Sequence, residues 1–302
     1  MGAGAPAGVP VSGAGQAPGR PLGTEGAAGA EPGGGPDAGQ GEKAADEDEL
    51  LRIAADRAMR AGGLLLERYR SGAAARGVHA KSTPTDLVSD ADLDAERSIR
   101  EGIQELRPHD AILGEEGDDR PGTTGLRWVV DPLDGTVDFL FGIPHWCVSV
   151  AVQDGRGTVA GAIFDPLRGE LFTGTRGGEA RLEDRSLHAS TCEDLAKAMV
   201  ATGFNYDSSV RARQAQVLLE LLPKARDIRR FGAAALDLAW TAAGRFDAFY
   251  ERGVHIWDVA AGVLLCERAG LSCRELPERG GLPWGVLVAP PGLIEELFGL
   301  VG

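Results

Sequence analysis

The chain has 302 residues, 43% of them hydrophobic, and a formal net charge of −14 at pH 7. This length is enough for one large domain or two smaller ones with a sizeable buried core. The acidic balance argues against a nucleic-acid-binding protein, since such proteins use Lys and Arg to displace phosphate counterions. No run of about eighteen apolar residues predicts a membrane span.

Residues 1–46 are rich in Gly, Ala and Pro and poor in large apolar side chains, so we expect this segment to be disordered. Its start, MGAGAPAGVPVSGAGQAPGR, lacks the continuous apolar segment of a signal peptide. The cysteines form no CxxC pair and no zinc-ligand spacing, and they are Cys147, Cys192, Cys266 and Cys273. We expect reduced thiols in a cytoplasmic protein.

Residues 47–188 are predicted to form an N-terminal α+β part. A helical stripe runs through EDELLRIAADRAMRAGGLLLERYRSG, and Gly72 ends it. A second helix is expected from Ser89 or Asp90 to about Leu106, where Pro108 stops it. Short strands follow, with the sequences AILG, LRWVVD, CVSVAVQDG, TVAGAIFDP and GELFTGTRGG. This order predicts two helices on a mostly antiparallel sheet.

Residues 189–302 alternate strands and helices and are predicted to form a C-terminal α/β part. The expected strands are KAMVATGF, DIRRF, FDAFYE and WGVLVAP. The expected helices are VRARQAQVLLELLPKA, GAAALDLAWTAAG, DVAAGVLLCERAG and GLIEELFGLVG. Gly244 and Gly270 close the second and third of these helices. The two parts together predict a layered α/β arrangement with a site at their junction.

The stretch WVVDPLDGTVDF contains two aspartates, Asp131 and Asp134, in a sequence typical of a β-turn. Such a turn brings its ends within about 7 Å, so both carboxylates can point at one ligand. Gly135 lets the backbone approach a ligand closely, and Thr136 supplies a hydroxyl. The alternative is an acidic turn followed by a helix cap. FDPLRG, residues 164–169, repeats Asp-Pro-Leu with an arginine next and is predicted to be a plain hairpin turn.

Other acids stand where strands end or helices begin. Glu115 and Glu116 follow AILG, Asp258 opens a helix after VHIW, and Asp86 and Asp92 flank another helix start. Loops that converge on a site carry such positions. Gathered carboxylates raise one another's pKa, and a divalent cation relieves their repulsion. All-oxygen ligands select Mg²⁺, Mn²⁺ or Ca²⁺.

Five motifs, taken in this order, resemble the inositol monophosphatase family of the lithium-sensitive, metal-dependent sugar-phosphatase superfamily. They are KSTPTDLVSDAD (81–92), GEE (114–116), WVVDPLDGT (128–136), GAAAL (232–236) and YERGVHIWDVAAG (250–262). The resemblance implies an α/β (α+β) fold, a layered αβαβα sandwich of the inositol monophosphatase and fructose-1,6-bisphosphatase type. It also implies two or three Mg²⁺ ions, a small phosphate ester as substrate, inhibition by Li⁺ and a homodimer.

The resemblance further implies roles for individual residues. One Mg²⁺ would be held by Glu115, Asp131 and the Leu133 carbonyl, and a second by Asp131, Asp134 and Asp258. The attacking water would be activated by Thr136 with Asp92, while Lys81, Asp86 and Glu115 surround that water and a third ion. The substrate would contact Leu133, Asp134, Gly135, Thr136, Gly232, Ala233, Ala234, Glu251 and Asp258.

Two residues depart from the family pattern. Asp138 stands where Asn is usual, and Ala233 stands where Ser or Thr is usual; both positions bear on substrate choice. The neutral Val137, followed by FLFGIP, favours inositol 1-phosphate as the substrate. The alternatives are a phosphatase for histidinol phosphate or nucleotide 3′-phosphates, and a regulatory binding protein that has kept the fold.

Overall fold

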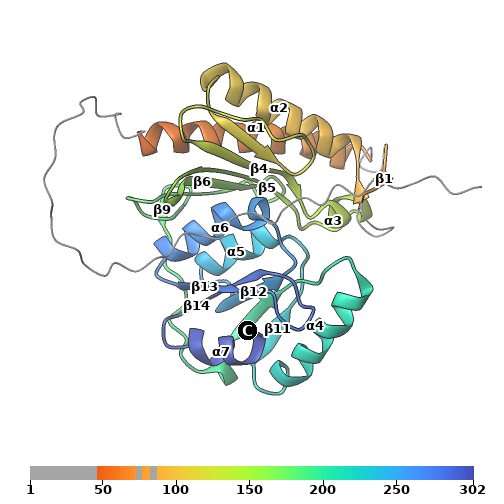
Figure 1. Cartoon of the computed structure of the whole chain (residues 1–302), viewed down its shortest axis with the longest axis vertical. Helices are drawn as coiled ribbons and strands as arrows, with labels where there is room; N and C mark the ends of the chain where they lie inside the picture. The colour runs from red at the N-terminus through yellow and green to blue at the C-terminus, as the bar shows by residue number, and fades with distance from the viewer. Residues whose placement is uncertain (1–45, 73–76, 82–86) are drawn as a thin grey trace, which may run out of the picture.

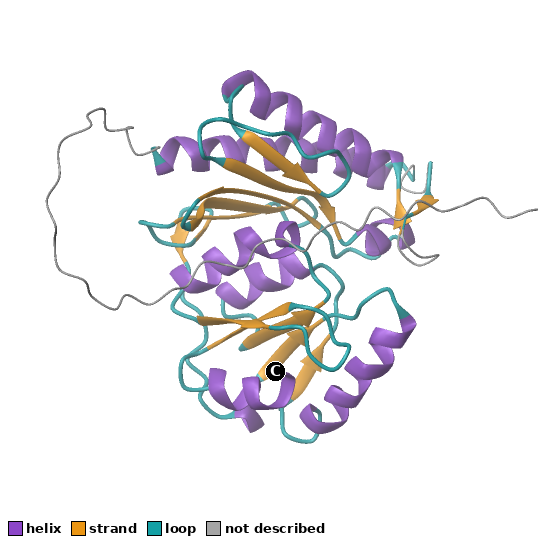
Figure 2. Ribbon diagram, viewed as in Figure 1, coloured by secondary structure: helices purple, strands orange, loops and turns teal. Residues whose placement is uncertain are grey.

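The structure is a computed structural model that describes residues 46–72, 77–81 and 87–302. Residues 1–45 of the segment predicted to be disordered lie outside the described residues, and so does Asp86. The described elements form five stacked layers, helix, sheet, helix, sheet and helix (Figures 1 and 2). The predicted layered αβαβα fold is therefore confirmed.

The outermost layer consists of two helices, α1 (Glu47–Arg70) and α2 (Asp90–Leu106). Both begin at a side-chain cap: Asp46 accepts a hydrogen bond from the Asp48 amide, and Ser89 forms a capping box with Asp92. The buried residues of α1 recur at helical spacing and include Leu50, Ile53, Ala58 and Leu65. This apolar stripe is why both helices lie against the first sheet.

The first sheet has seven strands in the order β3-β4-β5-β6-β7-β8-β9. Their bounds are β3 (Ala111–Gly114), β4 (Arg127–Asp134), β5 (Cys147–Asp154), β6 (Gly157–Asp165), β7 (Glu170–Thr175), β8 (Arg181–Leu182) and β9 (Arg185–Ser186). Only the β3–β4 pair is parallel among these strands. The central strands β4 and β5 are almost wholly buried, since helices cover both faces of the sheet.

The second sheet has the order β11-β10-β12-β14-β13. Its strands are β10 (Met199–Thr202), β11 (Asp227–Arg229), β12 (Ala248–Arg252), β13 (Ser272–Leu276) and β14 (Gly285–Ala289), and the 3₁₀ turn η1 (Leu195–Lys197) precedes β10. β10 runs parallel to β11 and β12, whereas β14 is antiparallel to both of its neighbours. β13 is not predicted from the sequence, because most of its residues are only partly buried and give no clear apolar pattern.

The middle and bottom layers are helical. α5 (Ala234–Ala242) and α6 (Ile256–Arg268) lie between the two sheets, and α4 (Ser208–Leu221) and α7 (Ile294–Val301) lie on the outer side of the second sheet (Figure 1). A Cβ on Gly161 of β6 would lie 2.9 Å from the Ala261 Cα of α6. Small residues at this contact let α6 approach the first sheet closely, which fixes the position of its first turn.

Three short elements complete the described chain: β1 (His79–Ala80), β2 (Leu87–Val88) and α3 (Thr136–Phe141). β1 and β2 form an antiparallel pair of their own. No described helix combines the length and apolar character needed to cross a membrane. The predicted division into domains at residues 188 and 189 stays a prediction, although strands up to β9 belong to the first sheet and those from β10 to the second.

The predicted β-turn from Asp131 to Asp134 is wrong. β4 continues through this stretch with a register shift, so that Asp131 lies opposite Ser149 and Asp134 opposite Cys147. Pro132 favours such an irregularity, because proline cannot donate a ladder hydrogen bond. The hairpin predicted for FDPLRG is confirmed, since this stretch joins β6 to β7.

Candidate active site

The end of β4 places two carboxylates in the interior. Asp131 is 1% exposed, and its Oδ1 accepts a hydrogen bond of 3.1 Å from the Leu133 amide. Gly135 follows with φ of 91°, and a Cβ there would lie 2.9 Å from the His145 carbonyl oxygen. Both the backbone conformation and the close contact exclude a side chain at this position.

Asp134 joins β4 to helix α5. Its Oδ1 accepts a hydrogen bond of 3.1 Å from the Ala234 amide, and its Oδ2 accepts one of 2.7 Å from the Ala235 amide. Burial and the charges of Asp258, Asp237 and Glu251 hold the pKa of Asp134 well above its usual range, and the amide of Ala235 opposes that shift. The predicted substrate residues Gly232, Ala233 and Ala234 therefore lie beside this aspartate.

Glu115 follows β3, and Asp258 lies in the first turn of α6, where its Oδ2 accepts a hydrogen bond of 2.6 Å from the His255 amide. Burial raises the pKa of Glu115; Lys81 opposes the shift and Asp258 adds to it. Burial together with Glu115, Asp134 and Asp258 raises the pKa of Asp131 well above its usual range. Burial raises the pKa of Asp258 to about 6. The structure thus brings the four predicted carboxylate ligands into one interacting group.

In the described part of the chain, no three Asp, Glu, His or Cys side chains stand in the arrangement of a ready-formed metal site. The four carboxylates nevertheless lie near enough to change one another's pKa. They offer only oxygen donors, and their shared negative charge is opposed by one lysine, Lys81. These donors fit a hard divalent cation such as Mg²⁺.

Thr136 and Asp92 meet beside this group. Thr136 Oγ1 lies 3.0 Å from Asp92 Oδ1 and 3.0 Å from the Leu133 carbonyl oxygen. The Asp92 Oδ2 atom accepts hydrogen bonds from the Ser89 amide at 2.9 Å and the Ser89 hydroxyl at 2.6 Å. Burial raises the pKa of Asp92, and these hydrogen bonds oppose the shift. The side chains of Asp92 and Thr136 are thus fixed before any ligand binds.

Glu251 lies on β12 and faces the same region. A Cβ on Gly203 would lie 2.0 Å from Glu251 Oε1, so a larger residue there would displace this carboxylate. Burial raises the pKa of Glu251 to about 8; Asp237 and Asp258 add to the shift, and Arg230 opposes it. Ala233 is fully buried, and its Cβ lies 3.1 Å from the position that a Cβ on Gly135 would take. The departure at Ala233 therefore lies at the contact between the 232–234 segment and the Gly135 backbone.

Lys81 forms ion pairs with two glutamates. Its Nζ lies 2.8 Å from Glu115 Oε1 and also contacts Glu116. Burial lowers the pKa of Lys81, but the two glutamates more than offset this and raise it. Burial and Glu115 raise the pKa of Glu116 to about 7. Asp86, predicted to act with Lys81, is not among the described residues.

The sequence analysis missed two acids that support the site. Glu96 accepts hydrogen bonds of 2.8 Å from the amides of Glu116 and Gly117, and so orders the loop after β3. Its position four residues after Asp92 places it on the same face of α2, which is a readable signal. Asp237 of α5 lies 3.0 Å from His145 Nε2. No comparable pattern in the sequence points to Asp237.

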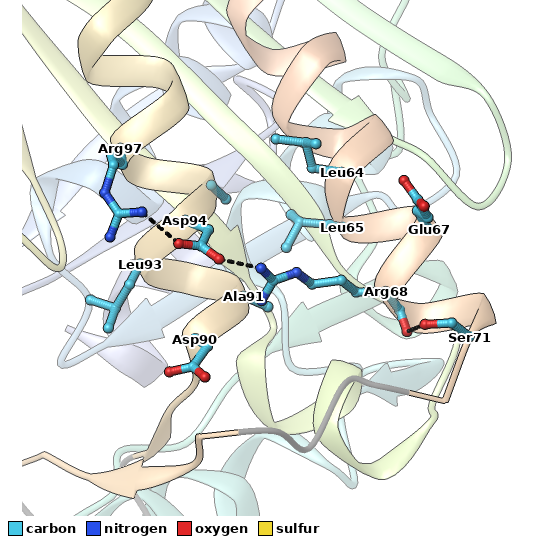
Figure 3. A pocket seen from close by; sticks show the side chains of 11 residues that line it. Leu64, Leu65, Glu67, Arg68, Ser71, Asp90, Ala91, Leu93, Asp94 and Arg97 are labelled. Carbon is cyan, nitrogen blue, oxygen red and sulfur yellow. Dashed lines mark hydrogen bonds and ion pairs between the residues drawn. The ribbon is translucent and has the colours of Figure 1, made fainter.

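A pocket of about 690 Å³ between α1 and α2 lies apart from these residues (Figure 3). Its lining includes Leu64, Arg68, Asp94 and Arg97, and none of the predicted site residues. Arg68 and Arg97 both pair with Asp94 (Figure 3). The two arginines share this one carboxylate, and the lining also includes Glu67 and Asp90, so the pocket has no net positive charge for an anionic ligand.

Comparison with known proteins places this arrangement in a family. The family model described as "Inositol monophosphatase family" matches residues 46–298. Inositol-1-monophosphatase SuhB of Mycobacterium tuberculosis is 43% identical over 239 residues, which cover 76% of this chain and 82% of that protein. Nus factor SuhB of Escherichia coli strain K12 is 40% identical over 223 residues, which cover 73% of this chain and 83% of that protein.

A solved structure agrees with this result. The extragenic suppressor protein suhB of Bartonella henselae superposes with a TM-score of 0.77 at 34% identity, over 84% of this chain and 98% of that one. The five sequence motifs, the αβαβα layers and the grouped carboxylates are thus explained together. The chain belongs to the inositol monophosphatase family.

Proposed function

We propose that this protein is a Mg²⁺-dependent phosphatase that hydrolyses a small phosphate monoester, with inositol 1-phosphate as the preferred substrate. One observation carries the proposal: Glu115, Asp131, Asp134 and Asp258 form an interacting carboxylate group, and the Thr136–Asp92 pair lies beside it. Such a group is unfavourable without a cation, because burial and mutual repulsion raise the pKa of its members.

The metal ligands would be Glu115, Asp131 and the Leu133 carbonyl for one ion, and Asp131, Asp134 and Asp258 for a second. Bound divalent ions supply positive charge that activates a water molecule and neutralises the leaving oxygen of the ester. Lys81 would keep Glu115 oriented and ionised through their 2.8 Å ion pair.

The remaining residues would bind, orient and move protons. Asp92, held by Ser89, orients the Thr136 hydroxyl and would accept its proton as the hydroxyl oxygen takes one from the attacking water. The amides of Gly135 and Thr136 would hold the phosphate oxygens. Glu251, whose pKa is raised to about 8, would accept or donate hydrogen bonds to hydroxyls of the leaving group.

Support for an inositol phosphate substrate comes from the relative in Mycobacterium tuberculosis, whose name is inositol-1-monophosphatase SuhB. The neutral Val137 next to the phosphate loop points in the same direction. Histidinol phosphate and nucleotide 3′-phosphates are the alternative substrates that the same carboxylate group could serve. The resemblance also predicts inhibition by Li⁺.

The test is release of inorganic phosphate, with and without MgCl₂, from inositol 1-phosphate, histidinol phosphate, fructose 1,6-bisphosphate and adenosine 3′,5′-bisphosphate. We expect Mg²⁺-dependent release, fastest from inositol 1-phosphate. Faster release from another ester would mean that this ester is the preferred substrate, and the proposed phosphatase activity would still stand. If Mg²⁺ binding is verified by calorimetry and no phosphate is released from any of these esters, the proposed phosphatase activity is wrong.

A second candidate is a regulatory binding protein, favoured by the 40% identity to a relative named Nus factor SuhB. The two roles are compatible in one chain. Binding of transcription proteins by a variant without phosphatase activity would support this second role.

A further inference from the structure

Asp138, the departure from the family pattern, is a buried carboxylate on α3 with one oxygen that lacks a partner. The residue is 4% exposed, and in the described part of the chain its Oδ2 has no hydrogen-bond partner. Burial raises the pKa of Asp138, and the charges of His145 and Arg230 oppose that shift. A buried carboxylate oxygen without a hydrogen bond is costly, so its nearest cation decides what this residue does.

Burial lowers the pKa of His145 to about 4, so its ring is neutral near pH 7 and Arg230 is the cation that remains near Asp138. A Cβ on Gly232 would lie 2.5 Å from Arg230 Nη1 and 3.2 Å from Asp138 Oδ2. Both charged atoms therefore lie beside Gly232, and the described structure has no direct ion pair or hydrogen bond between them. Gly232 has φ of 108°, a conformation that favours glycine, and the missing side chain leaves room for both groups.

Arg230 also acts on the substrate side of the site. Burial raises the pKa of Glu251, Asp237 and Asp138, and the charge of Arg230 opposes the rise at all three. The Arg230 guanidinium carbon lies 6.0 Å from the centre of the Phe204 ring, and the side chain is exposed. Arg230 is thus a cation at the wall of the predicted substrate pocket, next to the Gly232–Ala234 segment.

We propose that Asp138 is a positioning residue that holds Arg230 against the Gly232 wall, and that the pair sets substrate choice by charge. This inference rests on the proposed phosphatase function. An arginine without a carboxylate partner would bind a second phosphate group of the substrate in a two-point contact. The nearby charge of Asp138 offsets that of Arg230, so the site would favour esters whose leaving group is an uncharged polyol over bisphosphates.

The test compares the wild type, Asp138→Asn, Arg230→Gln and the double variant. The quantity measured is the ratio of kcat/KM for fructose 1,6-bisphosphate to kcat/KM for inositol 1-phosphate at saturating Mg²⁺. We expect Asp138→Asn to raise this ratio about tenfold, the size of one charge–charge interaction at a partly buried site. The double variant should lose the gain. An unchanged ratio in Asp138→Asn, or a gain that persists in the double variant, would overturn the proposal.

Asp154→Asn is the matched control. Asp154 also faces an arginine, since Arg176 Nη1 and Nη2 lie 2.9 and 2.8 Å from its two oxygens. This pair involves the ends of β5 and β7, outside the predicted site, so its removal should leave the substrate ratio unchanged. If Asp154→Asn changes the ratio as much as Asp138→Asn does, the ratio responds to the loss of a carboxylate charge anywhere in the protein. That result would contradict the proposal.

A second readout does not depend on turnover. Phenylglyoxal modifies free guanidinium groups, and mass spectrometry of the intact, folded chain after digestion follows the label on Arg230. Asp138→Asn should speed that labelling about tenfold, whereas Asp154→Asn should not. Equal rates in all three proteins would overturn the pairing. If the wild type hydrolyses no ester at all, the phosphatase proposal fails, and this rate still decides whether Asp138 holds Arg230.

Discussion

Asp134 Oδ2 accepts a hydrogen bond of 2.7 Å from the Ala235 amide, which stands 101 positions later in the chain. The contact joins the end of β4 to the first turn of α5. A predicted metal ligand is therefore also a link between the first sheet and the middle helical layer. Among the described residues, the backbone amide that donates to the Asp131 side chain is that of its near neighbour Leu133.

Replacement of these two aspartates by asparagine should change stability in opposite directions. Asp131→Asn keeps an oxygen for the Leu133 amide and removes a buried charge, so without metal its Tm should rise. Asp134→Asn retains one oxygen for the Ala234 and Ala235 amides, so it should cost about 1–2 kcal/mol of unfolding free energy. Thermal unfolding in EDTA measures both. A fall in Tm for Asp131→Asn would contradict the repulsion that we infer at this site.

The Thr136 hydroxyl should be needed for turnover and not for folding. Thr136→Val removes the group that lies 3.0 Å from Asp92 Oδ1, and we expect kcat to fall about 100-fold or more. Thr136→Ser keeps the hydroxyl and should recover most of the rate. Steady-state kinetics of both variants tests this. Equal losses in the two would contradict a role for the hydroxyl alone, because Thr136→Ser keeps it.

Glu251 should make the metal-free protein less stable as pH rises. Its pKa is raised to about 8 in the folded state, against about 4.3 in an unfolded chain. Its stabilising contribution is complete below the unfolded value and is lost as pH rises through about 8. Glu251→Gln mimics the protonated acid and should flatten the dependence of unfolding free energy on pH between about 5 and 9. Urea unfolding across that range, in EDTA, makes the comparison; parallel curves for the two proteins would rule out this assignment.

Arg252 should be a large contributor to stability outside the site. The side chain is 2% exposed and donates to backbone carbonyls, with Nε and Nη2 at 3.1 and 3.0 Å from Val301 and Nη1 at 2.9 Å from both Pro277 and Pro283. Arg252→Met would leave those buried carbonyls unpaired and should cost about 3 kcal/mol. The control is Arg97→Met, whose exposed pair with Asp94 should contribute less than about 1 kcal/mol. Similar costs for the two variants, measured by urea unfolding, would refute this account of Arg252.

The sequence predicted elements with strong patterns better than it predicted their irregularities. The apolar stripe of α1, the Ser89 start of α2 and the glycines that close α5 and α6 were all readable. The stretch from Asp131 to Asp134 was read as a turn, because Asp and Pro favour turns locally. In the structure, pairing with β5 and burial keep it in β4 as a bulge.

The residues of the candidate site that lie in short sequence motifs could be predicted from the sequence. Glu115, Asp131, Asp134 and Asp258 were found from acids at strand ends and helix starts. Arg230 and Asp237 could not be found in this way, because the residues that they influence are far away in the sequence. Asp138 is visible in the sequence as a departure, but only the structure shows that it and Arg230 both lie beside Gly232.

Two Asp-Pro-Leu segments of this chain offer the most direct test of the central claim. Asp131→Asn changes the segment that reaches the carboxylate group, and Asp165→Asn changes the hairpin copy, where Asp165 pairs with Arg168 at 2.7 Å. We predict that Mg²⁺-dependent phosphate release from inositol 1-phosphate falls at least about 1000-fold in Asp131→Asn and stays near the wild-type rate in folded Asp165→Asn. Wild-type release by Asp131→Asn would contradict the assignment of this group as the metal site.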